Sequence, residues 1–406
     1  MRLKTFGGVA LAAIFLAASA PSALAQQQGT VQVNKQMVAP MNEARAAIVA
    51  KDFATAKTKL DQASGFAKTP NETLLVEQLR VSLAANTNDW ASLVASVNAI
   101  EATNLLSAAD MKAYKAAVPE AYNKLGDKAK AQAATRAYLD QYGGTAEQYY
   151  GLALDLAKSN DNATAITYAN KAIEAASASG KAPEAYYQVL LLAHKQANEM
   201  DKYYAVEEKL LAQYPAEKYW RDMIVRVQSM PTFGASDRLD MFRAMTAAGV
   251  RLQEKEAAFA AAEALKRGLP NEAVELLQPG VDRGEVTDPN ALKDLKDAKA
   301  LIKEDKANLA KDTPALLKKG NASALASTGE AFLTYGDNDK AIELLQKALA
   351  GGLSGAEADS AKLHLGIAQY RAGQADAARI TWEGVTPGGV AGILAHNWTL
   401  ISNLKK

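Results

Sequence analysis

The stretch ASALASTGEAFLTYGDNDKAIELLQKALAGGLSGAEADSAKLHLGIAQYRAGQADAARITWEGV, residues 322–385, contains one pattern of small and apolar residues twice. Each copy is centred on a glycine, with a second glycine seven positions before it and an alanine five positions after it. A large apolar residue follows at the ninth position. The copies align as follows: Gly329 with Gly366, Phe332 with Gln369, Gly336 with Gly373, Ala341 with Ala378, Leu345 with Trp382, and Ala348 with Val385.

This spacing is typical of a close helical hairpin. Small residues on both sides of the turn let two antiparallel helices approach, and the large apolar residues fill the groove beside the contact. The central glycine supplies the positive φ that ends the first helix. The pattern of small residue, aromatic, Gly-Asp and alanine resembles the tetratricopeptide repeat (TPR), a helix–turn–helix unit. The resemblance implies an all-α, TPR-like α-solenoid, which binds a partner along its concave face.

The same frame recurs upstream at intervals close to the 34-residue TPR period. We predict about ten hairpins and a final capping helix at Ile393–Leu404. Seven turns are supported by the residues around them: Lys51-Asp52, Asn88-Asp89, Gly126-Asp127, Asn160-Asp161, Gly268, Gly336-Asp337 and Gly373. Three more are inferred from spacing, at Asn198, near Gly234 and near Ile302.

Two irregular segments interrupt the array. Residues 229–237 contain Pro231, Phe233 and Gly234 and cannot form a continuous helix, so we predict a bend or a domain boundary there. The expected arrays are residues 39–230 and 231–406, with the best-matching repeats at 322–385. Residues 278–289 are the second irregular segment, rich in Pro and Gly. Between Ala291 and Lys319, Lys alternates with Asp and Glu, which favours a solvated pair of amphipathic helices.

The N-terminus has the pattern of a secretory signal peptide. Arg2 and Lys4 precede an apolar stretch, and Ala23-Leu24-Ala25 is a cleavage signal, so we expect residues 1–25 to be removed after Ala25. Residues 26–38 would form a flexible leader. The chain has no cysteine, which excludes disulfides and a lipid-attachment cysteine. We therefore expect a periplasmic protein that is neither a lipoprotein nor membrane-spanning.

No motif predicts an enzyme, a cofactor or a metal site. The histidines are His194, His364 and His396, and none has a partner at metal-ligand spacing, so we interpret them as structural. Phosphate-binding glycine loops and a nucleophile elbow are absent from the sequence. A pair of carboxylates could still perform acid–base chemistry, because the chain has 45 acidic residues. A net charge of +1 gives no support for binding nucleic acid.

Tyrosine is the most unusual feature of the composition. Most tyrosines lie between residues 138 and 219, and two doublets open expected first helices one repeat apart. Equivalent members should stack across neighbouring units, which would suit an extended peptide or a glycan. The same aromatics could instead fill the core between hairpins. The candidate binding residues are Tyr149, Tyr150, Tyr186, Tyr187, Gln188 and Arg221.

Residues 238–277, together with LHLGIAQYRAG at 363–373, resemble uncharacterised TPR proteins of proteobacterial envelopes. The resemblance covers roughly the C-terminal 40% of the chain and includes no catalytic motif. Those proteins are suspected of working beside TonB-type uptake systems, and the resemblance implies a similar place for this chain.

Three functions are consistent with the sequence. The first is a non-enzymatic periplasmic scaffold that binds a protein or peptide partner on its concave face. The second is an accessory protein that binds glycan or peptidoglycan through the tyrosines. The third is an enzyme on an α-solenoid, like the helical murein transglycosylases, but no segment is left over for a catalytic domain.

Overall fold

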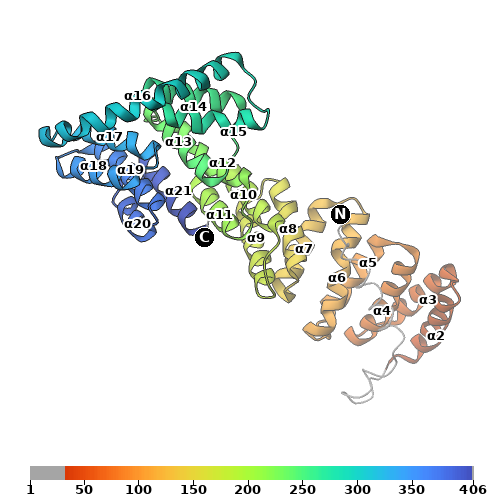
Figure 1. Cartoon of the computed structure of the whole chain (residues 1–406). Helices are drawn as coiled ribbons and strands as arrows, with labels where there is room; N and C mark the ends of the chain where they lie inside the picture. The colour runs from red at the N-terminus through yellow and green to blue at the C-terminus, as the bar shows by residue number, and fades with distance from the viewer. Residues whose placement is uncertain (1–32, 405–406) are drawn as a thin grey trace. The chain divides into compact units, whose positions relative to one another are not determined.

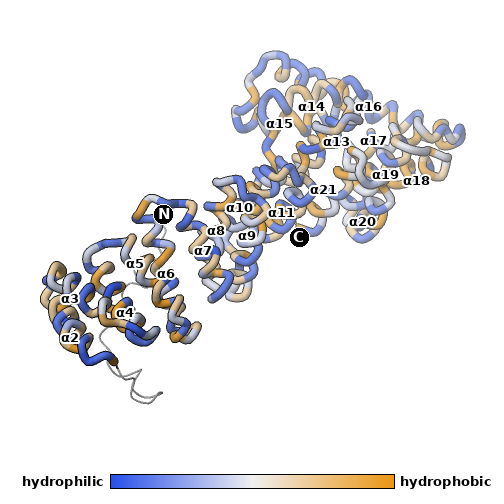
Figure 2. The backbone as a smooth tube through the Cα atoms, turned by 180° about the vertical axis from the view of Figure 1, so that it is seen from behind, coloured by the Kyte–Doolittle hydropathy of each residue, from blue (hydrophilic) through white to orange (hydrophobic). Residues whose placement is uncertain are grey.

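The computed structural model describes residues 33–404 and is all-α (Figure 1). In this part of the chain, twenty α-helices pack as sequential hairpins, as the sequence predicted for a TPR-like solenoid. The chain divides into two compact units, with the boundary in the sequence between Met200 and Asp201. Hydrophobic and hydrophilic segments alternate along the helices of each unit (Figure 2), as expected for elements that each bury one face.

The first unit consists of consecutive hairpins. Its helices are α2 (Lys35–Val49), α3 (Phe53–Phe66), α4 (Pro70–Thr87), α5 (Trp90–Thr103), α6 (Ala108–Lys124), α7 (Lys128–Tyr142), α8 (Ala146–Lys158), α9 (Asn162–Ser177) and α10 (Glu184–Gln196). Each helix packs on the next, and α8 also contacts α10, one repeat further on. Since α2 begins at Lys35 and buries Met37 completely, the predicted leader ends earlier than residue 38. The signal peptide and residues 26–32 lie outside the described residues.

The same turn motif ends the first helix and begins the second in most of the hairpins. The residue predicted at the turn adopts a positive φ, as at Asn88 (55°) and Gly336 (74°). In five hairpins an aspartate follows, and its carboxylate accepts a hydrogen bond from a backbone N–H of the second helix. The turns at positive φ are Lys51, Asn88, Gly126, Asn160, Asn198, Gly268, Gly336 and Gly373, which confirms the seven supported turns and the inferred turn at Asn198.

The second unit contains the remaining helices. They are α11 (Met200–Gln213), α12 (Glu217–Val225), the 3-10 helix η1 (Arg226–Ser229), α13 (Ala235–Ala248), α14 (Glu254–Lys266), α15 (Pro270–Asp282), α16 (Pro289–Lys319), α17 (Ala322–Thr334), α18 (Asn338–Ala350), α19 (Gly355–Arg371), α20 (Ala375–Glu383) and α21 (Val390–Leu404). The last helix packs on α19 and α20 and also on α12 and α13. It therefore joins the end of the unit to its beginning, in addition to covering the last repeat.

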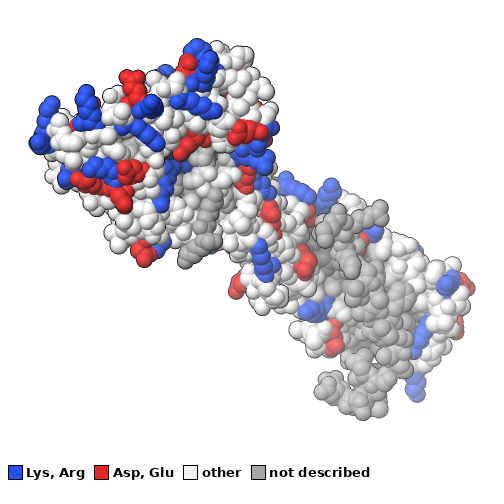
Figure 3. Space-filling view, viewed as in Figure 1, with Lys and Arg blue, Asp and Glu red and all other residues white. Residues whose placement is uncertain are grey.

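The predicted turn near Ile302 is wrong. Residues 289–319 form one helix, α16, which ends at Gly320 (φ 68°). The reason is local, because residues 298–312 are mostly Ala, Leu, Lys and Glu, which favour helix, and contain neither Gly nor Pro. The predicted pair of amphipathic helices is therefore a single helix, but most of its Lys, Asp and Glu side chains are exposed to solvent, as predicted. Figure 3 shows charged side chains of both signs on this face of the unit.

The two irregular segments are shorter than predicted. The chain leaves helical structure between Met230 and Gly234, where Gly234 is the N-cap of α13 at a φ of −118°. Pro231, the predicted domain boundary, lies inside the second unit. Helix α15 continues through Pro279 and Gly280 to Asp282, and α16 begins at Pro289. Among residues 33–404, no helix combines the length and the apolar character needed to cross a membrane.

Candidate functional site

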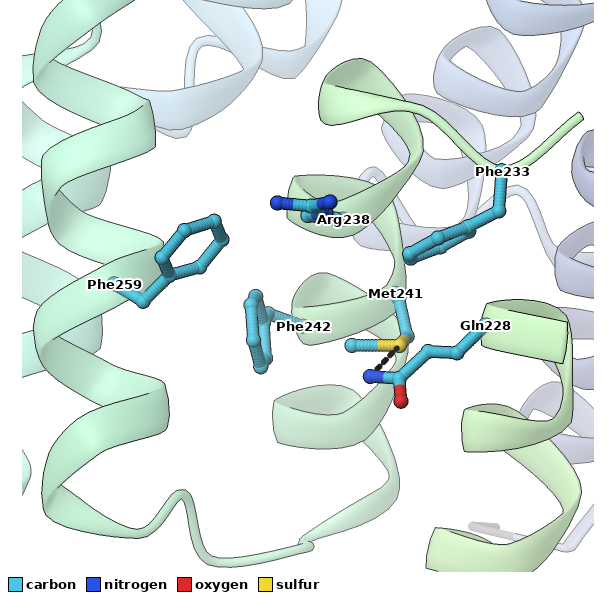
Figure 4. Close-up of a pocket in the computed structure, with 6 residues that line it drawn as sticks. All are labelled: Gln228, Phe233, Arg238, Met241, Phe242 and Phe259. Atoms are coloured by element: carbon cyan, nitrogen blue, oxygen red, sulfur yellow. Dashed lines mark hydrogen bonds between the residues drawn. The ribbon is translucent and has the colours of Figure 1, made fainter.

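A surface pocket of about 350 Å³ lies where the Met230–Gly234 segment meets α13 and α14 (Figure 4). Its residues are Gln228, Phe233, Arg238, Met241, Phe242 and Phe259. Phe242 and Met241 are buried and form the floor, whereas Phe259 on α14 remains 37% exposed. The irregular segment brings Phe233 to the opposite side. The pocket is therefore lined by apolar side chains and by the polar groups of Gln228 and Arg238, with polar and apolar surface in about equal shares, and it is open to solvent.

Among the described residues that line this pocket, Arg238 is the only charged one. Its guanidinium carbon lies 5.3 Å from the ring centre of Phe259 and 5.9 Å from that of Phe233, within reach of a cation–π contact. No carboxylate in the described part of the chain lies within ion-pair distance of Arg238. By contrast, Arg243 and Arg267 each have a carboxylate oxygen within 2.9 Å. The pocket therefore presents an exposed cation that has aromatic neighbours and no anion.

A buried ionic cluster lies deeper in the same unit. Arg243 of α13 donates from Nε and Nη2 to the two carboxylate oxygens of Glu272 on α15, both at 2.5 Å. Its Nη1 lies 2.6 Å from Asp240 Oδ1, and Nη2 lies 2.9 Å from Glu330 Oε1 on α17. Each of these residues is at most 6% exposed. One guanidinium thus holds three helices together through three carboxylates.

His364 of α19 completes the cluster. Its Nε2 lies 2.7 Å from Asp240 Oδ1 and 3.0 Å from Arg243 Nη1. Burial lowers the pKa of this imidazole, but the negative charges of Asp240 and Glu330 outweigh burial, and the pKa lies above its usual value. The pKa of Asp240 is shifted in the opposite direction. Burial raises it, but the positive charges of His364 and Arg243 hold it well below its usual range. The prediction that His364 is structural agrees with its place in this cluster.

The oxygens of Asp240 and Glu330 and the nitrogen of His364 lie within 4.8 Å of one another, which is a spacing that can hold a metal ion. The Arg243 guanidinium already contacts all three of these atoms, at 2.6, 2.9 and 3.0 Å. It is fixed there by its paired hydrogen bonds to Glu272. A metal ion would have to displace a cation that is already in place, so the geometry favours an ion-paired core over a metal site.

The tyrosine doublets open α8 and α10, as predicted, but their rings pack in a different combination. Tyr150 stacks on Tyr186 with ring centres 4.6 Å apart, and Tyr149 stacks on Tyr168 at 6.2 Å. The expected pairing of equivalent residues is therefore not the one observed. Tyr186 and Tyr187 are only 5% and 3% exposed, so most of their ring surface is in the core.

The other candidate residues are spread over both units. Tyr149 and Tyr150 are half-buried and keep some accessible ring surface. Gln188 is exposed and donates to Glu184. Arg221 belongs to the second unit, where it is paired with Glu256 at 2.7 Å. A second pocket of about 370 Å³ lies beside Tyr186, at the end of α9 and the start of α8. The six residues therefore do not form one site within either unit.

A buried carboxyl group in α11 has an unusual environment. Glu207 is 1% exposed, and its Oε2 has no hydrogen-bond partner among the described residues. Nearby, the Tyr203 hydroxyl donates to Asp222 Oδ2 at 2.6 Å. Burial, with the neighbouring charge of Asp222, raises the pKa of Glu207 to about 8. Glu207 therefore holds a proton at neutral pH.

We expect Glu207→Gln to stabilise the protein at alkaline pH and to change little at pH 5. A carboxyl group whose pKa is raised from 4.5 to about 8 opposes folding increasingly as pH rises between these values. Glutamine has nearly the same shape and does not ionise. Urea denaturation of both proteins at pH 5, 7 and 9 measures this difference. If the two proteins differ in the free energy of unfolding by the same amount at all three pH values, the raised pKa of Glu207 is wrong.

Sequence reasoning missed both the pocket and the ionic cluster. A partial signal was present, because Asp240 and Arg243 flank the apolar pair Met241 and Phe242 in the middle of α13. Charges at such positions are costly unless they find partners. Nothing in the order of residues shows that those partners come from Glu272, Glu330 and His364, up to 124 positions away.

Comparison with known proteins does not place the chain in a family. No family model matches it, and no curated protein matches it. Forty-two chains of solved structures do match. One of them, in the structure of Naa15/Naa10 bound to HypK-THB, is 12% identical, with a TM-score of 0.35. The match covers 86% of this chain and 63% of the other, so this chain spans less than two thirds of that protein. A likeness of this size says nothing about function.

Proposed function

We propose that this protein is a non-enzymatic scaffold of the bacterial periplasm that binds a protein partner through the pocket around Arg238. The observation that carries the proposal is an exposed, unpaired guanidinium among three phenylalanines, in an array of helical hairpins. Repeat arrays present extended surfaces, and such surfaces suit a segment of another protein. The signal-peptide pattern of residues 1–25 supports the periplasm, and the envelope TPR resemblance supports a place near an uptake system.

The charge balance of the second unit supports the choice of pocket. Arg221, Arg243 and Arg267 all neutralise carboxylates of the same unit. Arg238 instead lines a pocket with an apolar floor, beside an exposed aromatic ring. Phenylalanine, methionine and arginine are among the residue types that are enriched at protein interfaces. Tyr149 and Tyr150 in the first unit remain a second predicted contact surface.

A pull-down from an envelope extract tests the proposal, with residues 26–406 as bait. We expect one or a few proteins to be retained by the wild type and lost with Arg238→Gln/Phe259→Ala, because the variant removes the cation and one wall of the pocket. Both side chains are exposed, so the fold should survive, which circular dichroism checks.

Matched variants control this experiment. Arg283→Gln removes another exposed arginine, and Ile380→Ala removes an apolar side chain that is 71% exposed. Both should retain the partner. Loss of the partner with Tyr150→Ala instead would move the site to the first unit. If no bait retains a protein while isolated sacculi are retained, the glycan-binding alternative replaces the scaffold.

A further inference from the structure

Arg238 occupies a position where a positive charge is disfavoured. It is the fourth residue of α13, and the N-terminal turn of a helix carries a partial positive charge. The N-cap, Gly234, offers no side chain to accept hydrogen bonds from that turn. Asp237 in the same turn supplies one negative charge to the helix end, where its carboxylate accepts a hydrogen bond from the Gly234 N–H at 2.8 Å, but among the described residues no ion pair joins it to Arg238. An anion bound beside Arg238 would interact favourably with both the guanidinium and the helix end.

The cavity beside this cation has room for little more than one large side chain with its backbone. Its volume of about 350 Å³ is near the lower limit for ligand sites. The floor of Met241 and Phe242 is apolar, and the exposed ring of Phe259 leaves one side open. A peptide chain can therefore pass over the pocket and insert one apolar residue, and it need not end there.

Arg238 lies close to the two rings at the sides of the cavity. The guanidinium carbon of Arg238 lies 5.3 and 5.9 Å from the two phenylalanine ring centres. In an extended peptide, residues i and i+2 point to the same side and are roughly 6.6 Å apart. An apolar side chain in the cavity would thus place a carboxylate two residues away close to Arg238. Directly adjacent residues would point to opposite sides.

We propose that the pocket binds an extended peptide segment in which a large apolar or aromatic residue and an acidic residue are two positions apart. The apolar side chain lies against Phe242 and Phe259, and the carboxylate pairs with the Arg238 guanidinium. The exposed amide of Gln228, whose Nε2 donates to Met241 Sδ at 3.4 Å, can bond the peptide backbone. This proposal rests on the proposed protein-binding function and specifies the kind of segment that is recognised.

Short labelled peptides test the spacing by fluorescence anisotropy with residues 26–406. The probes are Gly-Ser-Phe-Ser-Glu-Ser-Gly and its reverse order Gly-Ser-Glu-Ser-Phe-Ser-Gly, both with blocked ends. We expect at least one to bind, and to bind about tenfold more weakly when Glu is replaced by Gln, since a charge-assisted hydrogen bond is lost. A peptide of the same composition with Phe and Glu adjacent should also bind more weakly.

Substitutions of pocket residues test which of them contact the acidic and apolar side chains of the peptide. Arg238→Gln should abolish the difference between the Glu and Gln peptides, while Arg238→Lys should keep part of it, because lysine retains the charge without the planar fork. Phe259→Ala should weaken both peptides. Arg283→Gln should bind like the wild type. Higher salt should reduce the preference for Glu.

Several results would overturn the proposal. They are equal binding of the Glu and Gln peptides, equal binding by Arg238→Gln and the wild type, and absence of binding by any peptide. The experiments distinguish failure of this peptide-recognition proposal from failure of the proposed scaffold function. A partner that is captured from envelope extract independently of Arg238 leaves the scaffold intact and removes this site. Peptide binding with no captured partner retains the site and removes the envelope role.

Discussion

Replacing Arg243 by methionine is expected to lower the free energy of unfolding by about 3–5 kcal/mol, the cost of leaving buried charges without a partner. Asp240, Glu272 and Glu330 are at most 6% exposed, and all three pair with this guanidinium, although Asp240 also pairs with His364 and Glu330 with Arg267. Methionine fills part of the space but carries no charge. Urea denaturation, followed by tryptophan fluorescence of the second unit, measures the effect.

Arg283→Met is the matched control for this variant. Arg283 is 39% exposed and pairs with Glu285 at 2.8 Å on the surface. Exposed ion pairs contribute at most about 1 kcal/mol, so the control should be close to wild type. An equal decrease in the free energy of unfolding in the two variants would show that the buried cluster contributes no more to stability than a surface ion pair.

Acidification should reduce the difference in the free energy of unfolding between the wild type and Arg243→Met. In the wild type the pKa of Asp240 and the pKa of Glu330 are both lowered; burial opposes this, but the charges of His364 and Arg243 outweigh it. Such groups contribute stability above their unfolded pKa values and lose it as pH falls. Without Arg243 the carboxylates can accept protons more easily. A difference in the free energy of unfolding that stays constant from pH 7 to pH 4 would contradict this account.

Gly366→Ala is expected to destabilise the second unit by about 1–3 kcal/mol, which is typical of an overpacked core. A Cβ at Gly366 would lie less than 3.0 Å from three atoms of the Trp382 indole. That ring cannot move freely, because it stacks on Trp398 at 6.0 Å and its Nε1 donates to the Leu363 carbonyl at 3.2 Å. Thermal denaturation with tryptophan emission as the signal measures the change.

Gly151→Ala provides the opposite control. Gly151 lies inside α8, and an added Cβ there would meet no atom within 4 Å. Alanine favours helix over glycine by roughly 1 kcal/mol, so this variant should be neutral or more stable. If Gly366→Ala were also neutral, the small residue seven positions before the turn would not be a close-packing requirement of the hairpin.

The positions of the turns could be predicted because their chemistry is local. An Asn or Gly at positive φ followed by an Asp N-cap needs only neighbouring residues, as at Asn88-Asp89 and Gly336-Asp337. The one contradicted turn, near Ile302, was inferred from spacing without such residues. Interpolating a repeat across a stretch of strong helix formers overlooked their own preference, and α16 continues through it.

The binding residues were harder to predict, because exposure depends on what packs above a residue. Tyr186 and Tyr187 have the composition of a binding surface, yet both are in the core. Arg238 has an ordinary sequence context, and its significance comes from Phe233 and Phe259, which reach it from a loop and from another helix.

The sequence by itself determined that this protein is a chain of helical hairpins, since turn residues, N-caps and small packing residues act over a few positions. Only the tertiary structure decided that Arg243 joins Asp240, Glu272 and Glu330, and that α21 returns to pack on α12 and α13. The physical reason is distance along the chain. Buried charges and a surface pocket depend on which helices meet, and helices separated by more than a hundred residues meet only after the whole unit has folded.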